Sequence, residues 1–205
     1  MPQAALPLPP PRLAADGTLR MVRLKNQRLI RISRFSNNEP YFGASGANRF
    51  DAPGCEVGAP EFRTCYFGLS LEVAVAETIL HDQIPVEGQF ILSYAEISRH
   101  YVHLFSGERL MLLELSGATL KRLAGHAELA GSASTLVTQQ WSLAVFKNPR
   151  TFDGFIYMSR HLNTQRAVVL FDRAYSKLQA RGTAVPLPEA RGFTAAVAKF
   201  CITTY

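Results

Sequence analysis

One carboxylate in this 205-residue sequence occupies a position where a charge is costly. Glu77 lies in the segment SLEVAVAETILHD, which is apolar almost all round a helix, and helices of that kind are buried. Val73, Ala76 and Leu80 share the face of Glu77 by helical spacing. An ionised, unpaired carboxylate there would cost several kcal/mol, so a polar group must meet it. That group is an arginine in a structural ion pair, a hydroxyl group or a substrate, and a substrate would make Glu77 catalytic.

Two arginines occupy places from which they could bind a phosphate. Arg31 alternates with Ile30 and Ile32 in an expected strand, and Arg49 lies in the loop GASGANRFDAPG, whose glycines let the backbone approach a ligand. A planar guanidinium group binds phosphate oxygens in a bidentate way that lysine cannot match. Each arginine also has an ordinary interpretation, as an exposed strand residue or as a loop charge.

A tyrosine and a serine complete the set of candidate site residues. Tyr66 lies in TCYFGLS, a strand that ends just before the Glu77 helix, so the chain can bring the two residues together. Its ring could stack on a planar ligand or belong to the core. Ser159 ends the strand in DGFIYMSRH, where its hydroxyl could face a cleft or cap a turn.

The pattern of apolar residues predicts an α+β fold with mixed or antiparallel strands, because strands come in runs and do not alternate strictly with helices. A long loop region over 36–62 is of the kind that is more often functional than filler. Expected strands cover residues 29–33, 64–68, 89–96, 101–105, 110–115, 154–159 and 166–171. Expected helices cover 71–81, capped by Ser70, a segment after Gly117, 134–147 and 193–200, with a short strand to Tyr205.

Composition limits the class of protein. With 47% hydrophobic and 19% charged residues, the chain is expected to fold as one domain. No apolar run approaches the roughly 18 residues of a membrane span. Cys55, Cys65 and Cys201 are too widely spaced for a metal site and suit a reducing compartment. We therefore expect a cytoplasmic protein that contacts no membrane and needs no metal.

The net charge of +6 is confined to one end of the chain. Residues 1–34 carry seven Lys or Arg residues and one acidic residue, whereas residues 35–205 sum to zero. Five of the twelve prolines also occur by position 11. We expect residues 1–27 to form a loosely ordered, basic, proline-rich arm and residues 28–205 to form the folded domain. Such an arm could contact nucleic acid or an acidic partner, but it is more often a solvated tail.

Five short motifs occur in an order that resembles the RES-domain family, which is named for arginine, glutamate and serine. The motifs are RIS, NRFD, CYFG, LEVAVAE and DGFIYMSR, and the resemblance spans about residues 29–172. It implies a fold similar to ADP-ribosyltransferases. It also implies that Arg31 and Arg49 grip a pyrophosphate, Tyr66 stacks on nicotinamide, Glu77 is the catalytic carboxylate, and Ser159 orients Glu77 or an amide group. Arg34 is close enough to Arg31 to be the alternative site arginine. The stretch between Arg49 and Tyr66 is somewhat long for the family.

The resemblance further implies a function. RES domains are toxins of bacterial toxin–antitoxin pairs that degrade NAD, so we expect cleavage of the nicotinamide–ribose bond of NAD with water or phosphate as acceptor. An Xre-type antitoxin would be the partner and would make any contact with DNA, and a homodimer is compatible with the family. Two alternatives stay open: transfer of ADP-ribose to a protein or small molecule by the same residues, and a non-enzymatic module that binds phosphorylated ligands or nucleic acid.

Overall fold

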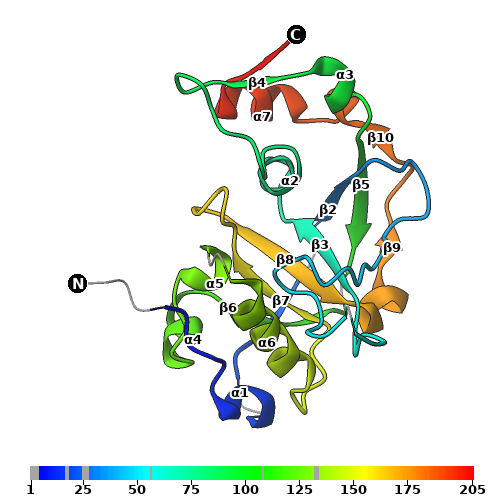
Figure 1. Ribbon diagram of the computed structural model, residues 1–205. Coiled ribbons are helices and arrows are strands. Elements are labelled where there is room, and N and C mark those ends of the chain that lie inside the picture. Colours follow the sequence, from blue (N-terminus) through cyan, green and yellow to red (C-terminus); the bar gives the residue numbers. More distant parts are fainter. Residues whose placement is uncertain (1–4, 17–18, 25–27, 56, 108, 132–133) are drawn as a thin grey trace.

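A large, mostly antiparallel sheet organises the computed structural model, which describes residues 5–16, 19–24, 28–55, 57–107, 109–131 and 134–205 (Figure 1). In spatial order its strands are β1 (Met21–Arg23), β6 (Met111–Leu115), β7 (Gly154–Met158), β8 (Arg166–Phe171), β3 (Thr64–Gly68), β2 (Arg28–Ser33), β5 (Tyr101–Ser106) and β10 (Val185–Pro186), and β9 (Gln179–Ala180) pairs with β5. Strands β6 and β7 pair in parallel, and the other neighbours are antiparallel. The expected α+β class with mixed strands is confirmed.

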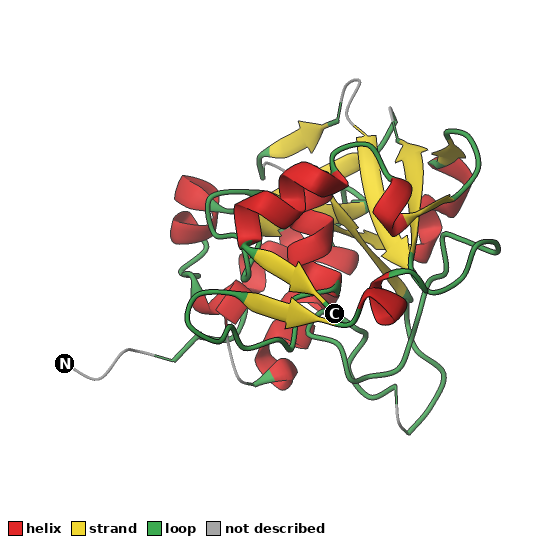
Figure 2. Ribbon diagram, turned by 90° about the horizontal axis from the view of Figure 1, so that it is seen from above, coloured by secondary structure: helices red, strands yellow, loops and turns green. Residues whose placement is uncertain are grey.

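Helices and a small second sheet pack against this large sheet. A two-stranded parallel sheet joins β4 (Phe90–Leu92) to β11 (Ile202–Thr204), and the C-terminus lies at its end (Figure 2). The helices are α1 (Pro11–Ala15), α2 (Leu71–Thr78), α3 (Tyr94–Ile97), α4 (Gly117–Arg122), α5 (Glu128–Gly131), α6 (Thr135–Phe146) and α7 (Phe193–Phe200), with short 3-10 turns η1 (Asp172–Lys177) and η2 (Leu187–Glu189). No helix among the described residues is long and apolar enough to cross a membrane.

Helix α2 lies between the main sheet and α7, as its apolar sequence predicts (Figure 1). Val73 joins the core formed with α6, whereas Val75 joins the core formed with α7 and β5. The expected cap is confirmed, because the Ser70 hydroxyl accepts a hydrogen bond from the Val73 amide at 3.3 Å. A Cβ at Gly68 would lie 2.7 Å from the Ala74 nitrogen, so glycine permits the close approach of β3 and α2. The helix ends at Thr78, a little earlier than expected.

The expectation that residues 1–27 are loosely ordered is wrong for the part of this segment that the structure describes. Leu13 is fully buried, and its carbonyl oxygen accepts a hydrogen bond from Asn148 Nδ2 at 2.7 Å. The indole nitrogen of Trp141 donates to the Pro7 carbonyl at 2.8 Å, and β1 pairs with β6. Leucines spaced among the prolines supply apolar side chains that the core accepts. The boundary between arm and domain stays a prediction.

The strand expected over 89–96 is also partly wrong. It stops at β4, and α3 follows directly. The Ser93 hydroxyl accepts a hydrogen bond from the Glu96 amide at 3.4 Å, which caps the new helix. A serine followed three residues later by a glutamate is a known signature of a helix start, and it outweighs the strand-like apolar run before it.

Candidate active site

A cavity of about 200 Å³ lies where β2, β3, β7 and α2 meet the loop that precedes β3. Four of the five predicted site residues line it, although they come from four different segments. The lining includes Arg31, Asn48, Arg49, Phe50, Tyr66, Gly68, Glu77, His81 and Tyr157. The fifth predicted residue, Ser159, is hydrogen-bonded to Glu77. The structure therefore brings all five predicted residues together.

The Glu77 carboxylate is held from the end of β7. The Ser159 hydroxyl donates a hydrogen bond to Oε1 of Glu77, and the Arg160 amide donates to the same oxygen at 3.1 Å. Ser159 is only 1% exposed, and its oxygen in turn accepts a hydrogen bond from the Leu162 amide at 3.0 Å. That third bond fixes the hydroxyl so that its proton points to Glu77. A serine hydroxyl and a backbone amide thus supply polar contacts that a carboxylate on a buried helix requires, and the Tyr157 hydroxyl is also hydrogen-bonded to Glu77.

Arg49 is carried by a loop that a buried aspartate pins in place. Asp51 is 1% exposed and accepts hydrogen bonds from the hydroxyls of Thr64 at 2.7 Å and Ser45 at 2.9 Å. It also accepts one from the Asn48 side chain at 3.1 Å. Asp51, the aspartate of the NRFD motif, therefore stabilises the loop through buried hydrogen bonds, and its role in the site is structural.

Helix α6 holds the same loop from the other side through three polar side chains. Thr138 donates to the Arg49 carbonyl at 2.6 Å, and Ser142 donates to the Phe50 carbonyl at 2.8 Å. Gln139 donates to the Gly46 carbonyl at 2.7 Å. Hydrogen bonds to consecutive backbone carbonyls leave the loop little freedom, so Arg49 enters the cavity from a rigid support.

The guanidinium of Arg49 lies in surroundings that disfavour its charge. Burial lowers the pKa of Arg49, and the neighbouring charge of Arg160 lowers it further, although Tyr157, Glu77 and Tyr66 oppose these effects. A cation whose charge is disfavoured in the free protein gains from any anion that enters the cavity. The arrangement around Arg49 therefore suits an anionic ligand.

Arg31 is paired with a glutamate that the sequence did not single out. Its Nε lies 2.5 Å from Oε2 of Glu39, whose side chain is 1% exposed, and the Tyr41 amide donates to the same oxygen at 2.7 Å. Burial would raise the pKa of Glu39, but the hydrogen bond and charge of Arg31 outweigh it and leave the pKa lowered. Because Glu39 takes Nε, the terminal nitrogens of Arg31 are the ones available to a ligand.

Two tyrosines line the cavity, and the sequence predicted one of them. The hydroxyl oxygen of Tyr66 accepts a hydrogen bond from the Phe50 amide at 3.1 Å. Burial raises the pKa of Tyr66 and of Tyr157, and the Glu77 charge adds to the rise for Tyr157, so both rings stay neutral at physiological pH. Tyr157 precedes Ser159 by two residues in an extended segment, so both side chains face the same way. That spacing could have identified it.

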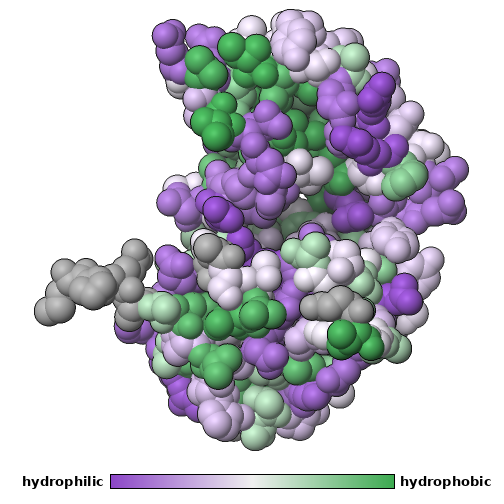
Figure 3. Space-filling view, viewed as in Figure 1, coloured by the Kyte–Doolittle hydropathy of each residue, from purple (hydrophilic) through white to green (hydrophobic). Residues whose placement is uncertain are grey.

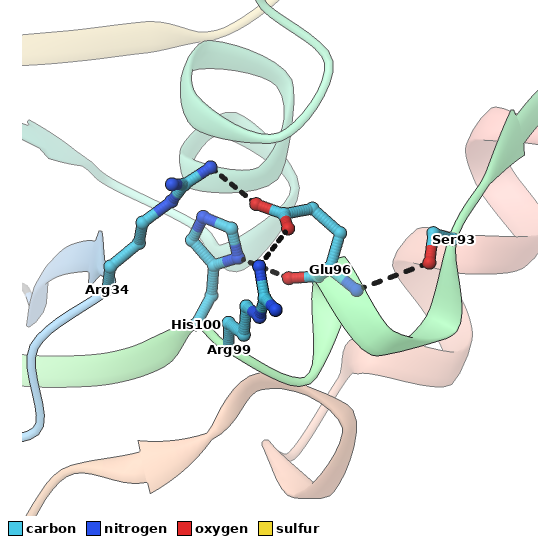
Figure 4. Close-up of polar contacts among 5 residues, drawn as sticks. All are labelled: Arg34, Ser93, Glu96, Arg99 and His100. Carbon is cyan, nitrogen blue, oxygen red and sulfur yellow. Dashed lines mark hydrogen bonds and ion pairs between the residues drawn. The ribbon is translucent and has the colours of Figure 1, made fainter.

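Arg34, the alternative to Arg31, lies elsewhere. Its exposed guanidinium is paired with Glu96, which also accepts a hydrogen bond from Arg99 at 3.2 Å (Figure 4). His100 Nδ1 lies 2.9 Å from the Glu96 carbonyl oxygen in the same cluster. This cluster borders a separate hollow of about 400 Å³. The structure therefore places Arg31, not Arg34, in the candidate site.

The family of the chain follows from a comparison with known families. The RES domain family matches residues 27–188, which is most of the chain. The chain belongs to the RES-domain family. This RES domain is 31% identical over 98 residues to the probable toxin y4kH of Sinorhizobium fredii, a match that covers 47% of this chain and 76% of that protein.

A solved structure shares the fold of this RES domain. It is a chain of the MbcT–MbcA toxin–antitoxin complex of M. tuberculosis, with a TM-score of 0.59 at 13% sequence identity, covering 80% of this chain and 85% of that one. At such low identity the match bears on the fold alone. It confirms the expected architecture of a single α+β domain.

Proposed function

We propose that this RES domain is the toxin of a bacterial toxin–antitoxin pair and that it cleaves the nicotinamide–ribose bond of NAD. The toxin assignment is supported by the family and by relatives that are themselves a probable toxin and part of a toxin–antitoxin complex. The observation that carries the enzymatic assignment is a fixed carboxylate, Glu77, in one cavity with Arg31, Arg49 and Tyr66.

The reaction needs charge stabilisation more than it needs proton donation. The nicotinamide ring of NAD is already cationic, so it leaves with the bonding electron pair as a neutral amide. Positive charge then develops at C1′ and the ring oxygen of the ribose, as in glycoside cleavage. A carboxylate that two donors hold in place, as Ser159 and Arg160 hold Glu77, can stabilise this charge without first reorganising.

The size of the cavity suggests how the dinucleotide would lie. Pockets that enclose a drug-sized ligand have about 300–1,000 Å³, whereas this cavity has about 200 Å³. It would therefore enclose only the reacting end of NAD, with the nicotinamide against Tyr66 and the ribose at Glu77. The pyrophosphate would lie between Arg31 and Arg49, whose terminal nitrogens suit bidentate contacts to phosphate oxygens.

The two arginines also suggest how an antitoxin would block the site. A carboxylate side chain or a chain terminus placed between Arg31 and Arg49 would occupy the pyrophosphate position and use the same hydrogen-bond donors. The partner we propose is a DNA-binding antitoxin of the Xre type, so this chain would meet DNA only through that partner.

The test is a product analysis with purified protein. Wild type and the Glu77→Gln variant are incubated with NAD in the presence and absence of phosphate, and nicotinamide, ADP-ribose, its phosphate ester and labelled protein are quantified. Nicotinamide with equal ADP-ribose indicates hydrolysis, and the phosphate ester indicates phosphorolysis. Labelled protein without free ADP-ribose would favour ADP-ribosyl transfer instead. No nicotinamide from wild type would refute the proposal.

A further inference from the structure

A hydrogen-bonded histidine and aspartate lie at the candidate site, and neither residue belongs to the motifs that carry the family resemblance. His81 follows the end of α2 and lines the same cavity as Glu77. Its Nδ1 lies 2.7 Å from Oδ1 of Asp82. A carboxylate can only accept a hydrogen bond, so Nδ1 carries the proton and Nε2 is left as the acceptor nitrogen of the ring. Half of the His81 side chain is exposed, 49%, so acceptor molecules can reach it.

A second histidine and several charged groups surround this histidine–aspartate pair. The ring of His161, on the turn between β7 and β8, lies 4.9 Å from that of His81. Burial lowers the pKa of His161, with Glu77 opposing this effect and His81 adding to it. The groups that share this electrostatic environment are Asp82, His161, Glu77, Arg160 and Arg49. Figure 3 shows hydrophilic side chains across the middle of this face, where the end of α2 and the turn between β7 and β8 lie in Figure 1.

We infer that His81 is the general base that activates the acceptor in this site, with Asp82 as a positioning residue that fixes its tautomer. The inference rests on the proposed function and adds to it the removal of a proton from the acceptor, a step that Glu77 does not account for. In that step the C1′–N bond of NAD breaks and nicotinamide leaves with the electron pair. A water oxygen bonds to C1′ and its proton passes to Nε2 of His81, so the products are nicotinamide, ADP-ribose and one proton.

The experiment uses three variants of the full chain, with wild type alongside. His81→Gln removes the base, Asp82→Asn removes the partner of Nδ1, and Gln83→Ala changes an exposed neighbour in the same turn that does not line the cavity. Thermal unfolding checks that each variant is folded. Nicotinamide release from NAD is then measured from pH 5 to pH 9, with and without sodium azide, an anion that attacks carbon without losing a proton.

We expect His81→Gln to lower kcat roughly 100-fold, at the low end of what general base catalysis contributes, with little change in KM. The pH profile of nicotinamide release should also differ from that of wild type, because glutamine has no ionisable group to accept the proton. Azide should restore nicotinamide release in His81→Gln and yield ADP-ribosyl azide, while it changes the wild-type rate little. Asp82→Asn should show a smaller fall, and Gln83→Ala should behave as wild type.

Two results would overturn the role of His81 and leave NAD cleavage intact. One is a folded His81→Gln protein with the wild-type rate and pH profile. The other is a slow variant that azide does not rescue, or that azide accelerates no more than wild type, since its defect would then not be a missing base. Failure of the proposed function looks different, because wild type itself would then release no nicotinamide.

Discussion

Replacing Glu77 with glutamine separates its charge from its shape. The Ser159 hydroxyl and the Arg160 amide both donate hydrogen bonds to the same oxygen of the carboxylate, Oε1. The carbonyl oxygen of a glutamine can take that position and accept both hydrogen bonds, so the variant should fold as wild type does. What it lacks is the negative charge that would face the ribose in the transition state.

The size of the effect follows from comparable electrostatic groups. Removing one preorganised stabilising group from an active site costs about 2.7–4 kcal/mol, or roughly 100- to 1,000-fold in kcat. We therefore expect Glu77→Gln to lower nicotinamide release at least about 100-fold. Glu72→Gln is the matched control, because Glu72 lies on the same helix outside the cavity.

The assay follows nicotinamide by chromatography, together with NAD concentration in bacteria after induction. Expression of wild type should arrest growth as the NAD concentration falls, and co-expression of the antitoxin should restore both growth and NAD. Expression of Glu77→Gln should neither arrest growth nor lower the NAD concentration. A folded Glu77→Gln protein with near-normal turnover would refute the reasoning and make Glu77 a structural residue. Growth arrest with unchanged NAD would point to ADP-ribosylation of a specific target.

Further predictions concern Arg49, the ion pair between Arg31 and Glu39, and the N-terminal segment. Arg49→Lys keeps the charge but loses the bidentate geometry, so the KM for NAD should rise more than kcat falls, and unchanged steady-state kinetics would remove Arg49 from the site. Glu39→Gln should lower the free energy of unfolding by about 2 kcal/mol in urea unfolding. Disrupting a fully buried ion pair would cost more, but the Arg31 side chain is 20% exposed. Because the pKa of Glu39 is lowered in the fold, its contribution is present above the ordinary glutamate pKa and is lost as pH falls through the lowered value. Wild type should thus lose more stability on acidification than Glu39→Gln, and equal losses would contradict this account. Leu13→Ala should lower the free energy of unfolding by about 3 kcal/mol, and deletion of residues 1–24 should lower it further. If the segment were a loose arm, neither change would affect the free energy of unfolding.

The parts of the site that the sequence predicted are those with a local signal. The apolar run around Glu77 predicts a buried helix, and Ser70 marks its start. Since β3 leads straight into α2, the proximity of Tyr66 and Glu77 could also be predicted from the order of elements. The N-terminal segment shows the opposite case, because its prolines suggested disorder while two leucines, Leu6 and Leu13, were sufficient for burial.

The parts that the sequence missed depend on contacts between distant segments. Thr138 holds the Arg49 backbone from 89 residues away, and Gln139 holds the Gly46 backbone from 93 residues away. Nothing in the local pattern of α6 says which backbone its polar residues will meet. Glu39 was missed for a different reason, since a single acidic residue in a loop gives no periodic signal before its partner strand is known.

The balance of charge in the site explains why these distant contacts matter together. Three guanidinium groups, those of Arg31, Arg49 and Arg160, act on the same region as two carboxylates, those of Glu39 and Glu77. Glu39 forms an ion pair with Arg31, so part of this positive charge is already balanced within the protein. An excess of positive charge in a partly desolvated cavity favours a phosphate ligand, yet Glu77 must stay anionic for the reaction. Hydrogen bonds from the Ser159 hydroxyl and the Arg160 amide, at the end of β7, hold it in place beside these cations. The carboxylate is therefore positioned to meet the positive charge that would develop on the substrate.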